Sequence, residues 1–308
     1  MSLISLIVPL YNEAQNVAPL IEQLSCVKVP GYKIEIILIN DGSTDDTEIQ
    51  VAKHIQKNIR LINFARNYGQ TAAMSAGFDT AKGEIIVSLD GDLQNDPADI
   101  PKLIEKMDEG YDIVSGWRVN RQDKFIRVLP SMIANRLISW ISGVYIHDYG
   151  CTLKAYRKDL VHDFKLYGEM HRFIPIYGYW QGAKIAEIPV NHRSRQFGKS
   201  KYGMIRIFKV LLDLLTIKFL GSYSTKPIYF FGGIGSAFSV LGVLIFLITL
   251  YEKVFLHIWV HRNPWFVLGL FMFLTGVQFL FFGILAEIIM RTYYESSGKK
   301  IYRVKSSR

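Results

Sequence analysis

Two long stretches without any charged residue constrain this chain more than any other feature. Pro227–Tyr251 has none in 25 positions, and Trp265–Ala286 has none in 22. A helix of about 20 apolar residues is long enough to cross the hydrocarbon core of a bilayer. Tyrosine and tryptophan side chains flank both stretches, as they do at membrane–water interfaces. We therefore expect two transmembrane helices; the alternative is a buried hairpin in a large soluble protein.

Positive charges are distributed unevenly around these stretches. The loop 252–264 between them carries only Lys253 and Arg262 as fixed positive charges, whereas many precede the first stretch and follow the second. This bias predicts that the loop is extracytoplasmic and that both termini are cytoplasmic. Met204–Leu220 interleaves apolar and charged residues and is expected to form an amphipathic helix in the membrane interface. The alternative is an ordinary surface helix packed on the preceding domain.

Composition narrows the range of partners. The formal net charge is +9, from 36 Lys and Arg against 27 Asp and Glu. A basic chain can bind nucleic acid, but beside two membrane spans the charge favours an anionic membrane surface or a phosphorylated substrate. We therefore expect no nucleic acid. Cys26 and Cys151 are the only cysteines, so neither a disulfide framework nor a Cys/His zinc site is expected.

The first 200 residues alternate between patterns typical of strands and of helices. Apolar runs typical of strands lie at 4–8, 34–39, 60–64, 85–89, 113–115 and 183–188. Helix-length segments lie at 14–24, 45–56, 71–80, 98–107 and 129–141. This alternation predicts an α/β domain whose mainly parallel sheet is covered on both faces. The run at 4–8 is interpreted as the first strand and not as a cleavable signal.

Acidic side chains follow three of the predicted strands. Asp90-Gly91-Asp92 closes the run at 85–89, and Gln94 adds an amide oxygen two residues later. Positions i and i+2 of an extended chain point the same way, so both carboxylates face one spot. Tyr11-Asn12-Glu13 leaves the first strand and Asn40–Asp45 the second, and the carboxyl ends of parallel strands share one edge of a sheet. Hard oxygen ligands at this edge suit Mg²⁺ or Mn²⁺ bound together with substrate phosphates.

These motifs resemble those of family 2 glycosyltransferases of the GT-A fold. The resemblance is closer to the polyprenyl-phosphate glycosyltransferases, such as bacterial bactoprenol glucosyltransferases and dolichol-phosphate mannose synthases. Asp90-Gly91-Asp92-Leu93-Gln94 is similar to that family's metal motif. Arg66-Asn67-Tyr68-Gly69-Gln70 and Arg195-Gln196-Phe197-Gly198-Lys199-Ser200-Lys201 are similar to further family segments. The resemblance covers roughly residues 3–225, and the two-helix tail matches the bacterial glucosyltransferase type.

The resemblance implies a role for each motif. The residues that would hold the nucleotide are Pro9, Tyr11, Glu13, Asp41, Arg66 and Asp90. Those that would surround a divalent cation, Mg²⁺ or Mn²⁺, are Asp90, Asp92 and Gln94. Arg118 and Arg127 would hold the acceptor phosphate, and Arg195 and Lys201 would serve the diphosphate or the acceptor. The candidate catalytic residues are Asp92, Asp148 and Glu169, the last two for positioning or proton handling.

A chain with these parts is expected to transfer a hexose to a polyprenyl phosphate such as undecaprenyl phosphate. The second pKa of a phosphate monoester is about 6, so the acceptor is mostly ionised at neutral pH and needs no strong general base. Direct attack on the anomeric carbon inverts its configuration, while the metal stabilises the departing nucleoside diphosphate. The resemblance favours UDP-glucose as the donor, with GDP-mannose and other UDP sugars as alternatives.

Two other classes of protein are weighed against this enzyme. A polysaccharide synthase would carry a Gln-x-x-Arg-Trp motif and more membrane spans, and the sequence has neither. A non-catalytic, nucleotide-binding membrane scaffold would have no need for the intact carboxylates Asp90 and Asp92.

Four parts are expected along the chain. They are a cytosolic GT-A domain at 1–202, a juxtamembrane amphipathic helix and linker at 203–226, a two-helix transmembrane domain at 227–290 and a basic cytosolic tail at 291–308. The resemblance implies a bacterial inner-membrane protein with its catalytic domain in the cytoplasm. It also implies a homo-oligomer, with a tetramer as the expected form.

Overall fold

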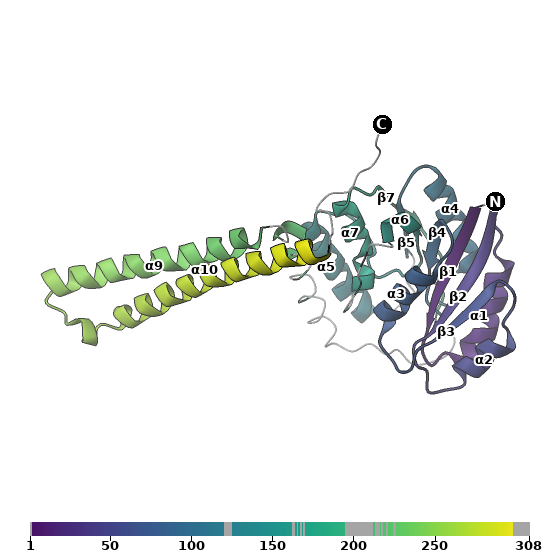
Figure 1. Cartoon of the computed structure of the whole chain (residues 1–308), viewed down its shortest axis with the longest axis horizontal. Coiled ribbons are helices and arrows are strands. Elements are labelled where there is room, and N and C mark those ends of the chain that lie inside the picture. The colour runs from purple at the N-terminus through teal and green to yellow at the C-terminus, as the bar shows by residue number, and fades with distance from the viewer. Residues whose placement is uncertain are drawn as a thin grey trace. The chain divides into compact units, whose positions relative to one another are not determined.

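The computed structural model describes residues 2–119, 125–161, 164, 166, 168, 170–194, 212, 216, 218, 219, 221–223 and 226–297, with only the backbone described at 125–131, 133 and 297. The chain divides into two compact units, residues 1–214 and 215–308. Figure 1 draws both units.

The first unit is built on a sheet whose strand order, within the described residues, is β3-β2-β1-β4-β6-β5-β7. The strands are β1 Ser2–Leu10, β2 Tyr32–Asn40, β3 Ile59–Asn63, β4 Ile85–Ser88, β5 Ile113–Trp117, β6 Lys154–Arg157 and β7 Ile185–Pro189. All neighbouring pairs are parallel except those of β6, which runs antiparallel between β4 and β5. The predicted mainly parallel sheet is thus confirmed. β6 was not predicted, because its short run contains Lys154 and Arg157 and lacks the apolar pattern of a buried strand.

Helices cover both faces of this sheet (Figure 1). They are α1 Ala14–Cys26, α2 Thr47–Lys53, α3 Gln70–Thr80, α4 Ile100–Asp108, α5 Phe125–Ser142, α6 Lys158–Val161 and α7 Ile174–Trp180, with 3-10 turns at Pro97–Asp99 and Met170–Arg172. Side chains alternate along β1, so that Leu6 packs in one core with α1 and α4, whereas Ile7 packs in the other with α3. The Asp96 carboxylate caps the 3-10 turn Pro97–Asp99 by accepting the Ala98 N–H at 3.1 Å.

The strand register decides where functional side chains gather. Leu10 at the end of β1 lies beside Asn40 at the end of β2, and Ile7 lies beside Ser88 at the end of β4. The loops that follow these three parallel strands therefore emerge along one edge of the sheet, where ligands bind in open α/β folds.

The second unit contains a hairpin of two long helices, α9 Pro227–Phe255 and α10 Pro264–Ser297. Both are long and apolar enough to cross a membrane, with mean hydropathies of 2.3 and 2.1 over their most apolar windows. The two uncharged stretches lie within them. The predicted amphipathic helix at 204–220 lies largely outside the described residues.

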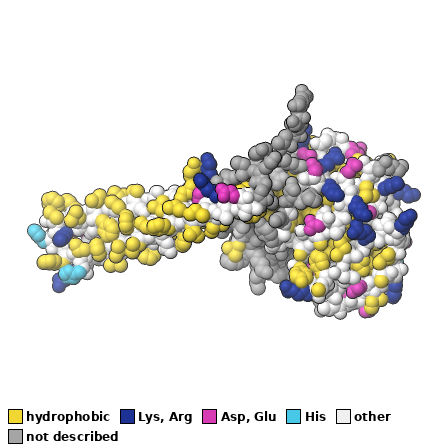
Figure 2. All heavy atoms as spheres, in the orientation of Figure 1, with side chains coloured by type: hydrophobic (Ala, Val, Ile, Leu, Met, Phe, Trp, Pro, Cys, Tyr) yellow, Lys and Arg dark blue, Asp and Glu magenta, His cyan; other side chains and the backbone are white. Residues whose placement is uncertain are grey.

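Glycines allow the two helices to pack closely. A Cβ on Gly242 of α9 would lie 2.8 Å from the Gly269 carbonyl oxygen, and one on Gly235 would lie 2.7 Å from that of Gly276. Large apolar side chains cover the outside of the hairpin (Figure 2). This arrangement of small residues inside and large apolar residues outside is typical of helices that pack in lipid.

Candidate active site

The metal motif directly follows β4 and forms a tight turn. A Cβ on Gly91 would overlap the Leu10 side chain, so glycine lets the motif lie against the end of β1. Leu93 is buried and adopts a φ of 62°, a left-handed conformation that costs on the order of 1 kcal/mol for such a side chain. Asp92 Oδ1 accepts the Gln94 N–H at 3.2 Å and fixes the turn. The packing of Gly91 and Leu93 therefore stabilises this strained turn, which carries the two carboxylates.

Asp90 sits in an environment that favours a bound cation. Its Oδ1 accepts a hydrogen bond from Gln70 Nε2 at 2.7 Å. Burial, followed by the negative charge of Asp92, raises the pKa of Asp90 to about 6. A hydrogen bond from Thr152 and the positive charge of Arg118 act in the opposite direction. The Asp92 charge disfavours ionisation of the Asp90 carboxyl, so a divalent cation bound between the two carboxylates would relieve this repulsion.

The available donors fit a cation that is shared with a substrate. Among the described residues, no three His, Cys, Asp or Glu side chains surround a common point. Asp90 and Asp92 supply carboxylates, and Gln94 supplies an amide whose nitrogen donates to the Arg193 carbonyl oxygen at 3.4 Å. Mg²⁺ commonly binds through one or two carboxylates, with phosphate oxygens and water completing its octahedron. The residues present therefore fit Mg²⁺ or Mn²⁺ held together with a diphosphate.

Asp41 organises the loop that carries the predicted nucleotide contact Arg66. The buried Asp41 carboxylate accepts the backbone N–H groups of Tyr68 at 2.7 Å and Gly69 at 2.9 Å. Burial raises the pKa of Asp41, and these two hydrogen bonds oppose the increase. Gly42 has a φ of 63°, and a Cβ there would overlap the backbone of Arg66. The Arg66 guanidinium lies 4.5 Å from the centre of the Tyr68 ring. Asp41 and Gly42 thus place this exposed arginine and tyrosine at the sheet edge.

The loop after β1 is tied to the loop after β2. The Asn12 N–H donates to Ser43 Oγ at 3.0 Å, and the Glu13 N–H donates to Thr47 Oγ1 at 2.9 Å. Asn12 adopts a φ of 53°, which asparagine tolerates better than most residues. The predicted nucleotide-binding residues that the strand order places along this common edge are Pro9, Tyr11, Glu13, Asp41 and Asp90.

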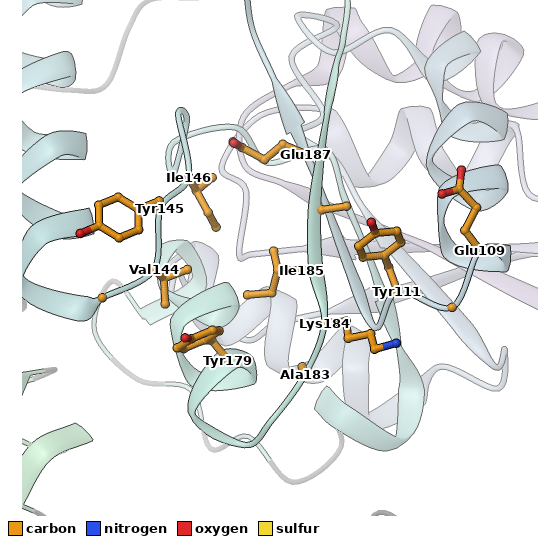
Figure 3. Close-up of a pocket in the computed structure, with 13 residues that line it drawn as sticks. Glu109, Tyr111, Val144, Tyr145, Ile146, Tyr179, Ala183, Lys184, Ile185 and Glu187 are labelled. Carbon is orange, nitrogen blue, oxygen red and sulfur yellow. The ribbon is translucent and has the colours of Figure 1, made fainter.

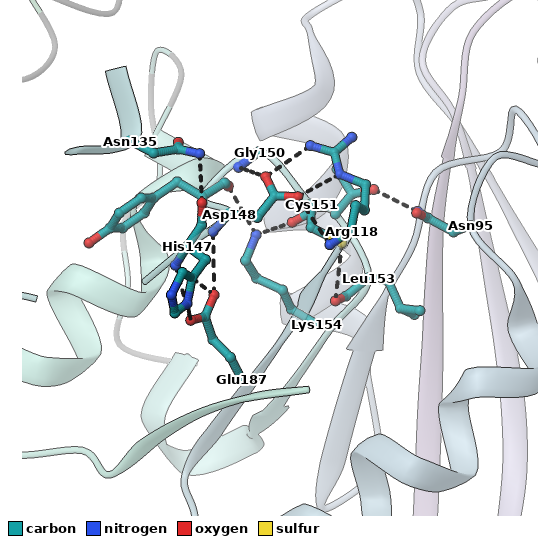
Figure 4. A network of polar contacts seen from close by, with 12 residues as sticks. Asn95, Arg118, Asn135, His147, Asp148, Gly150, Cys151, Leu153, Lys154 and Glu187 are labelled. Atoms are coloured by element: carbon teal, nitrogen blue, oxygen red, sulfur yellow. Dashed lines mark hydrogen bonds and ion pairs between the residues drawn. The ribbon is translucent and has the colours of Figure 1, made fainter. Parts of the chain in front are cut away.

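A second polar group lies beyond β4 on the antiparallel side of the sheet (Figure 4). Arg118 follows β5 and forms two hydrogen bonds with the buried Asp148, Nε to Oδ2 at 2.7 Å and Nη2 to Oδ1 at 2.9 Å. Lys154, also buried, donates from Nζ to the carbonyl oxygens of Tyr149, at 3.2 Å, and Cys151. Burial lowers the pKa of Lys154. The Asp148 carboxylate therefore orients Arg118, and its predicted part in catalysis stays a prediction.

Three polar residues near the site were not predicted. Gln70 holds Asp90, Lys154 holds the loop after Asp148, and the buried His171 Nδ1 lies 2.7 Å from Thr71 Oγ1 at the start of α3. Burial lowers the pKa of His171 well below its usual value, so the ring is neutral. Gln70 lies in a segment that the sequence had singled out, whereas nothing local distinguishes Lys154.

Some predicted site residues cannot be placed. Glu169, Arg195 and Lys201 lie outside the described residues, as does the side chain of Arg127.

Sequence comparison identifies relatives of the whole chain. The model of the family described as Glycosyl transferase family 2 matches residues 5–164. A dodecaprenyl-phosphate galacturonate synthase of Rhizobium johnstonii is 43% identical over 310 residues, covering 98% of this chain and 92% of that protein. An undecaprenyl-phosphate 4-deoxy-4-formamido-L-arabinose transferase of Photorhabdus laumondii is 36% identical, covering 97% and 92%.

Structural comparison supports the fold alone. Glucosyl-3-phosphoglycerate synthase of Mycobacterium tuberculosis, solved with Mn²⁺, uridine diphosphate and phosphoglyceric acid, superposes with a TM-score of 0.57 at 18% identity. The match covers 71% of this chain and 78% of that one. The same synthase with glucosyl-3-phosphoglycerate, Mn²⁺ and uridine diphosphate gives a TM-score of 0.56. The predicted GT-A fold is therefore confirmed.

Proposed function

The chain belongs to glycosyl transferase family 2, among the polyprenyl-phosphate sugar transferases, and we propose that it moves one sugar from a nucleotide donor to the phosphate of a polyprenyl lipid. The observation that carries this proposal is the position of Asp90 and Asp92. They lie at the sheet edge that also carries the nucleotide loops, in a chain with two helices apolar enough to span a membrane. A lipid acceptor accounts for the hairpin, which a water-soluble acceptor would not require.

We assign a separate role in an inverting sugar transfer to each group of residues in the site. Asp90, Asp92 and Gln94 would hold the divalent cation, which when bound neutralises charge on the diphosphate. The loops after β1 and β2 and the Arg66 loop hold the nucleoside. Arg118, oriented by Asp148, would receive the acceptor phosphate, since a guanidinium can donate to two phosphate oxygens at once. One oxygen of the ionised phosphate attacks the anomeric carbon without a strong base.

The donor sugar is the finer part of the proposal. The sequence resemblance favours UDP-glucose, whereas the two relatives described above are named for galacturonate and for 4-deoxy-4-formamido-L-arabinose. We place UDP-galacturonate first, because 43% identity over 98% of this chain is a stronger relation than motif resemblance. UDP-glucose is the second candidate, and GDP-mannose is the third.

The proposal also covers membrane association, topology and oligomeric state. Membrane association follows from the two helices and from the lipid carriers that the relatives are named for. The proposed topology places residues 1–202 and the basic tail at 291–308 in the cytoplasm, where nucleotide sugars are made, with the loop 252–264 outside. A homo-oligomer such as a tetramer is proposed from family resemblance.

A donor screen on the reconstituted full-length protein tests the proposal. Each nucleotide sugar is incubated with undecaprenyl phosphate and Mn²⁺, and lipid products are identified by mass spectrometry. The expected product from UDP-galacturonate is a lipid monophosphate carrying one hexuronate, with the β configuration. An α-linked product would exclude single displacement. Absence of any lipid-linked sugar across all donors would favour the scaffold alternative.

A further inference from the structure

Glu187 of the edge strand β7 receives an unusual number of hydrogen bonds. Its Oε1 accepts the backbone N–H groups of His147, at 2.9 Å, and Asp148, at 3.3 Å. Its Oε2 accepts the same His147 N–H at 3.0 Å and lies 2.9 Å from the His147 ring nitrogen Nδ1. One carboxylate thus fixes two consecutive peptide groups of the turn that carries Asp148 (Figure 4).

This turn contacts Arg118 directly through the Asp148 side chain. The Asp148 side chain is 1% exposed and accepts from Arg118 Nε and Nη2, from the Arg118 backbone N–H at 3.4 Å, and from the Gly150 N–H at 3.1 Å. A buried ion pair is stable only when its geometry is maintained, because each charge has lost its water. A displaced Asp148 would therefore displace the guanidinium of Arg118 as well.

Other contacts make the arrangement rigid. Glu187 lies beside Ser115 in the parallel pairing of β7 with β5, three residues before Arg118. The His147 ring stacks on Trp117 with a centroid distance of 4.3 Å, and Asn135 of α5 donates to the His147 carbonyl oxygen at 2.8 Å. The turn and the end of β5 are therefore held as one body, with the Glu187 carboxylate between them.

We propose that Glu187 is a positioning residue for the acceptor phosphate, acting through the His147–Asp148 turn to orient Arg118. The inference rests on the proposed function, in which Arg118 receives that phosphate. A carboxylate is required at this position because two backbone N–H groups and a ring nitrogen converge on it. A glutamine offers one acceptor oxygen and would direct its amide hydrogens toward backbone donors.

A second carboxylate near Glu187 provides a matched control. Glu187 and Glu109 both line a surface cavity of about 690 Å³, together with Tyr111, Tyr145 and Tyr179 (Figure 3). Glu109 accepts from Lys106 Nζ at 2.6 Å and lies at the end of α4, away from the Asp148 turn. Glu109→Gln removes the same charge from the same cavity without touching the turn.

The test measures KM for undecaprenyl phosphate and KM for the donor in the full-length reconstituted enzyme. Glu187→Gln is expected to raise the acceptor KM at least fivefold and to leave the donor KM within a factor of two. Glu187→Asp, which keeps the charge on a shorter side chain, should give an intermediate acceptor KM. Glu109→Gln should match the parent. A general loosening of the domain would instead raise both KM values, and that result would overturn the proposal.

A double-mutant cycle with Arg118→Ala separates this inference from the proposed function. If Glu187 acts through Arg118, Glu187→Gln should change the acceptor KM less than twofold in the Arg118→Ala background. An undiminished fivefold effect there would show that Glu187 does not act through Arg118. If Arg118→Ala alone leaves the acceptor KM unchanged, the acceptor assignment fails and the inference fails with it. Product formation by the parent enzyme reports separately on the proposed reaction.

Discussion

The two sides of the candidate site are built in different ways. The proposed donor side consists of the loops after β1, β2 and β4, three parallel strands adjacent in the sheet. The proposed acceptor side consists of Arg118 and the Asp148 turn, which depend on the antiparallel β6 and the edge strand β7. On the donor side, the functional side chains lie directly after the ends of the strands. On the acceptor side, the functional side chains are positioned by hydrogen bonds between residues that are distant in the sequence.

This difference in construction predicts a difference in sensitivity. On the donor side, the carboxylates themselves are expected to contact the metal, so that removing one should affect turnover. On the acceptor side, the charges pair with one another before any ligand is present, so that most single changes should act on the affinity for the acceptor. The predictions below test this contrast.

The largest effect is expected for Asp92→Asn. The amide keeps the size of the side chain but removes one of the two negative charges that would hold the cation, and kcat should fall at least a hundredfold. The melting temperature should change little, because the amide oxygen of asparagine can still accept the Gln94 N–H that fixes the turn. Turnover is measured with saturating donor and acceptor. Asp79→Asn, an exposed carboxylate on α3, is the matched control and should behave as the parent. Turnover near the parent value in Asp92→Asn would refute the metal assignment.

Two substitutions of Gln70 should lower kcat to different extents and so test the donor side further. Gln70→Ala removes a hydrogen bond to the Asp90 carboxylate and should lower kcat about tenfold, which corresponds to about 1.4 kcal/mol. Gln70→Glu should lower it further, because a second negative charge would lie against Asp90. Gln15→Ala on the exposed face of α1 is the control. Equal activities for Gln70→Ala and Gln70→Glu would show that the amide does not orient Asp90.

Metal binding should depend on pH through Asp90. Its pKa is raised to about 6 by burial and by Asp92, so the carboxylate is largely protonated at pH 5 and ionised at pH 7.5. Without metal, the native state holds this proton more tightly than the unfolded chain, so this group lowers the free energy of unfolding as pH rises from about 4 to about 6.

Saturating Mn²⁺ should restore the free energy of unfolding that the ionisation of Asp90 removes. At a hundred times its dissociation constant, a ligand stabilises the native state by about 2.7 kcal/mol, which is several degrees in melting temperature. The increase should be clear at pH 7.5, smaller at pH 5 and weak in Asp92→Asn at either pH. An equal increase at both pH values would show that Asp90 does not exchange a proton for the metal.

The same contrast explains what the sequence could predict. Parallel strands with mostly apolar runs, such as those at 4–8 and 85–89, are recognisable locally, and their order in an α/β fold brings the following acidic residues together. The strands that carry the proposed donor side could therefore be predicted from the sequence, whereas the roles of the residues that follow them stay predictions. β6 contains two charged residues in four and was not predicted. The contacts of Glu187 are with a turn about 40 residues earlier in the chain, which no local pattern encodes. Lys154 donates to carbonyl oxygens three and five residues before it, and these bonds depend on a loop conformation that the sequence pattern does not predict.

The smallest effect is expected for a substitution in the hairpin of α9 and α10. A Cβ on Gly242 would meet the Phe273 N at 2.7 Å and the Gly269 carbonyl oxygen at 2.8 Å, so Gly242→Leu must separate α9 from α10. A Cβ on Gly233 of the same helix would meet no atom of the described residues within 4 Å, which makes Gly233→Leu the matched control.

Gly242→Leu should lower the melting temperature in detergent by a few degrees and raise the KM for undecaprenyl phosphate two- to threefold. Because the donor side is formed entirely by the first unit, the donor KM should not change, and Gly233→Leu should resemble the parent in all three measurements. A change confined to the donor KM would contradict the division of the site, since it would require the hairpin to support the nucleotide loops and not the lipid.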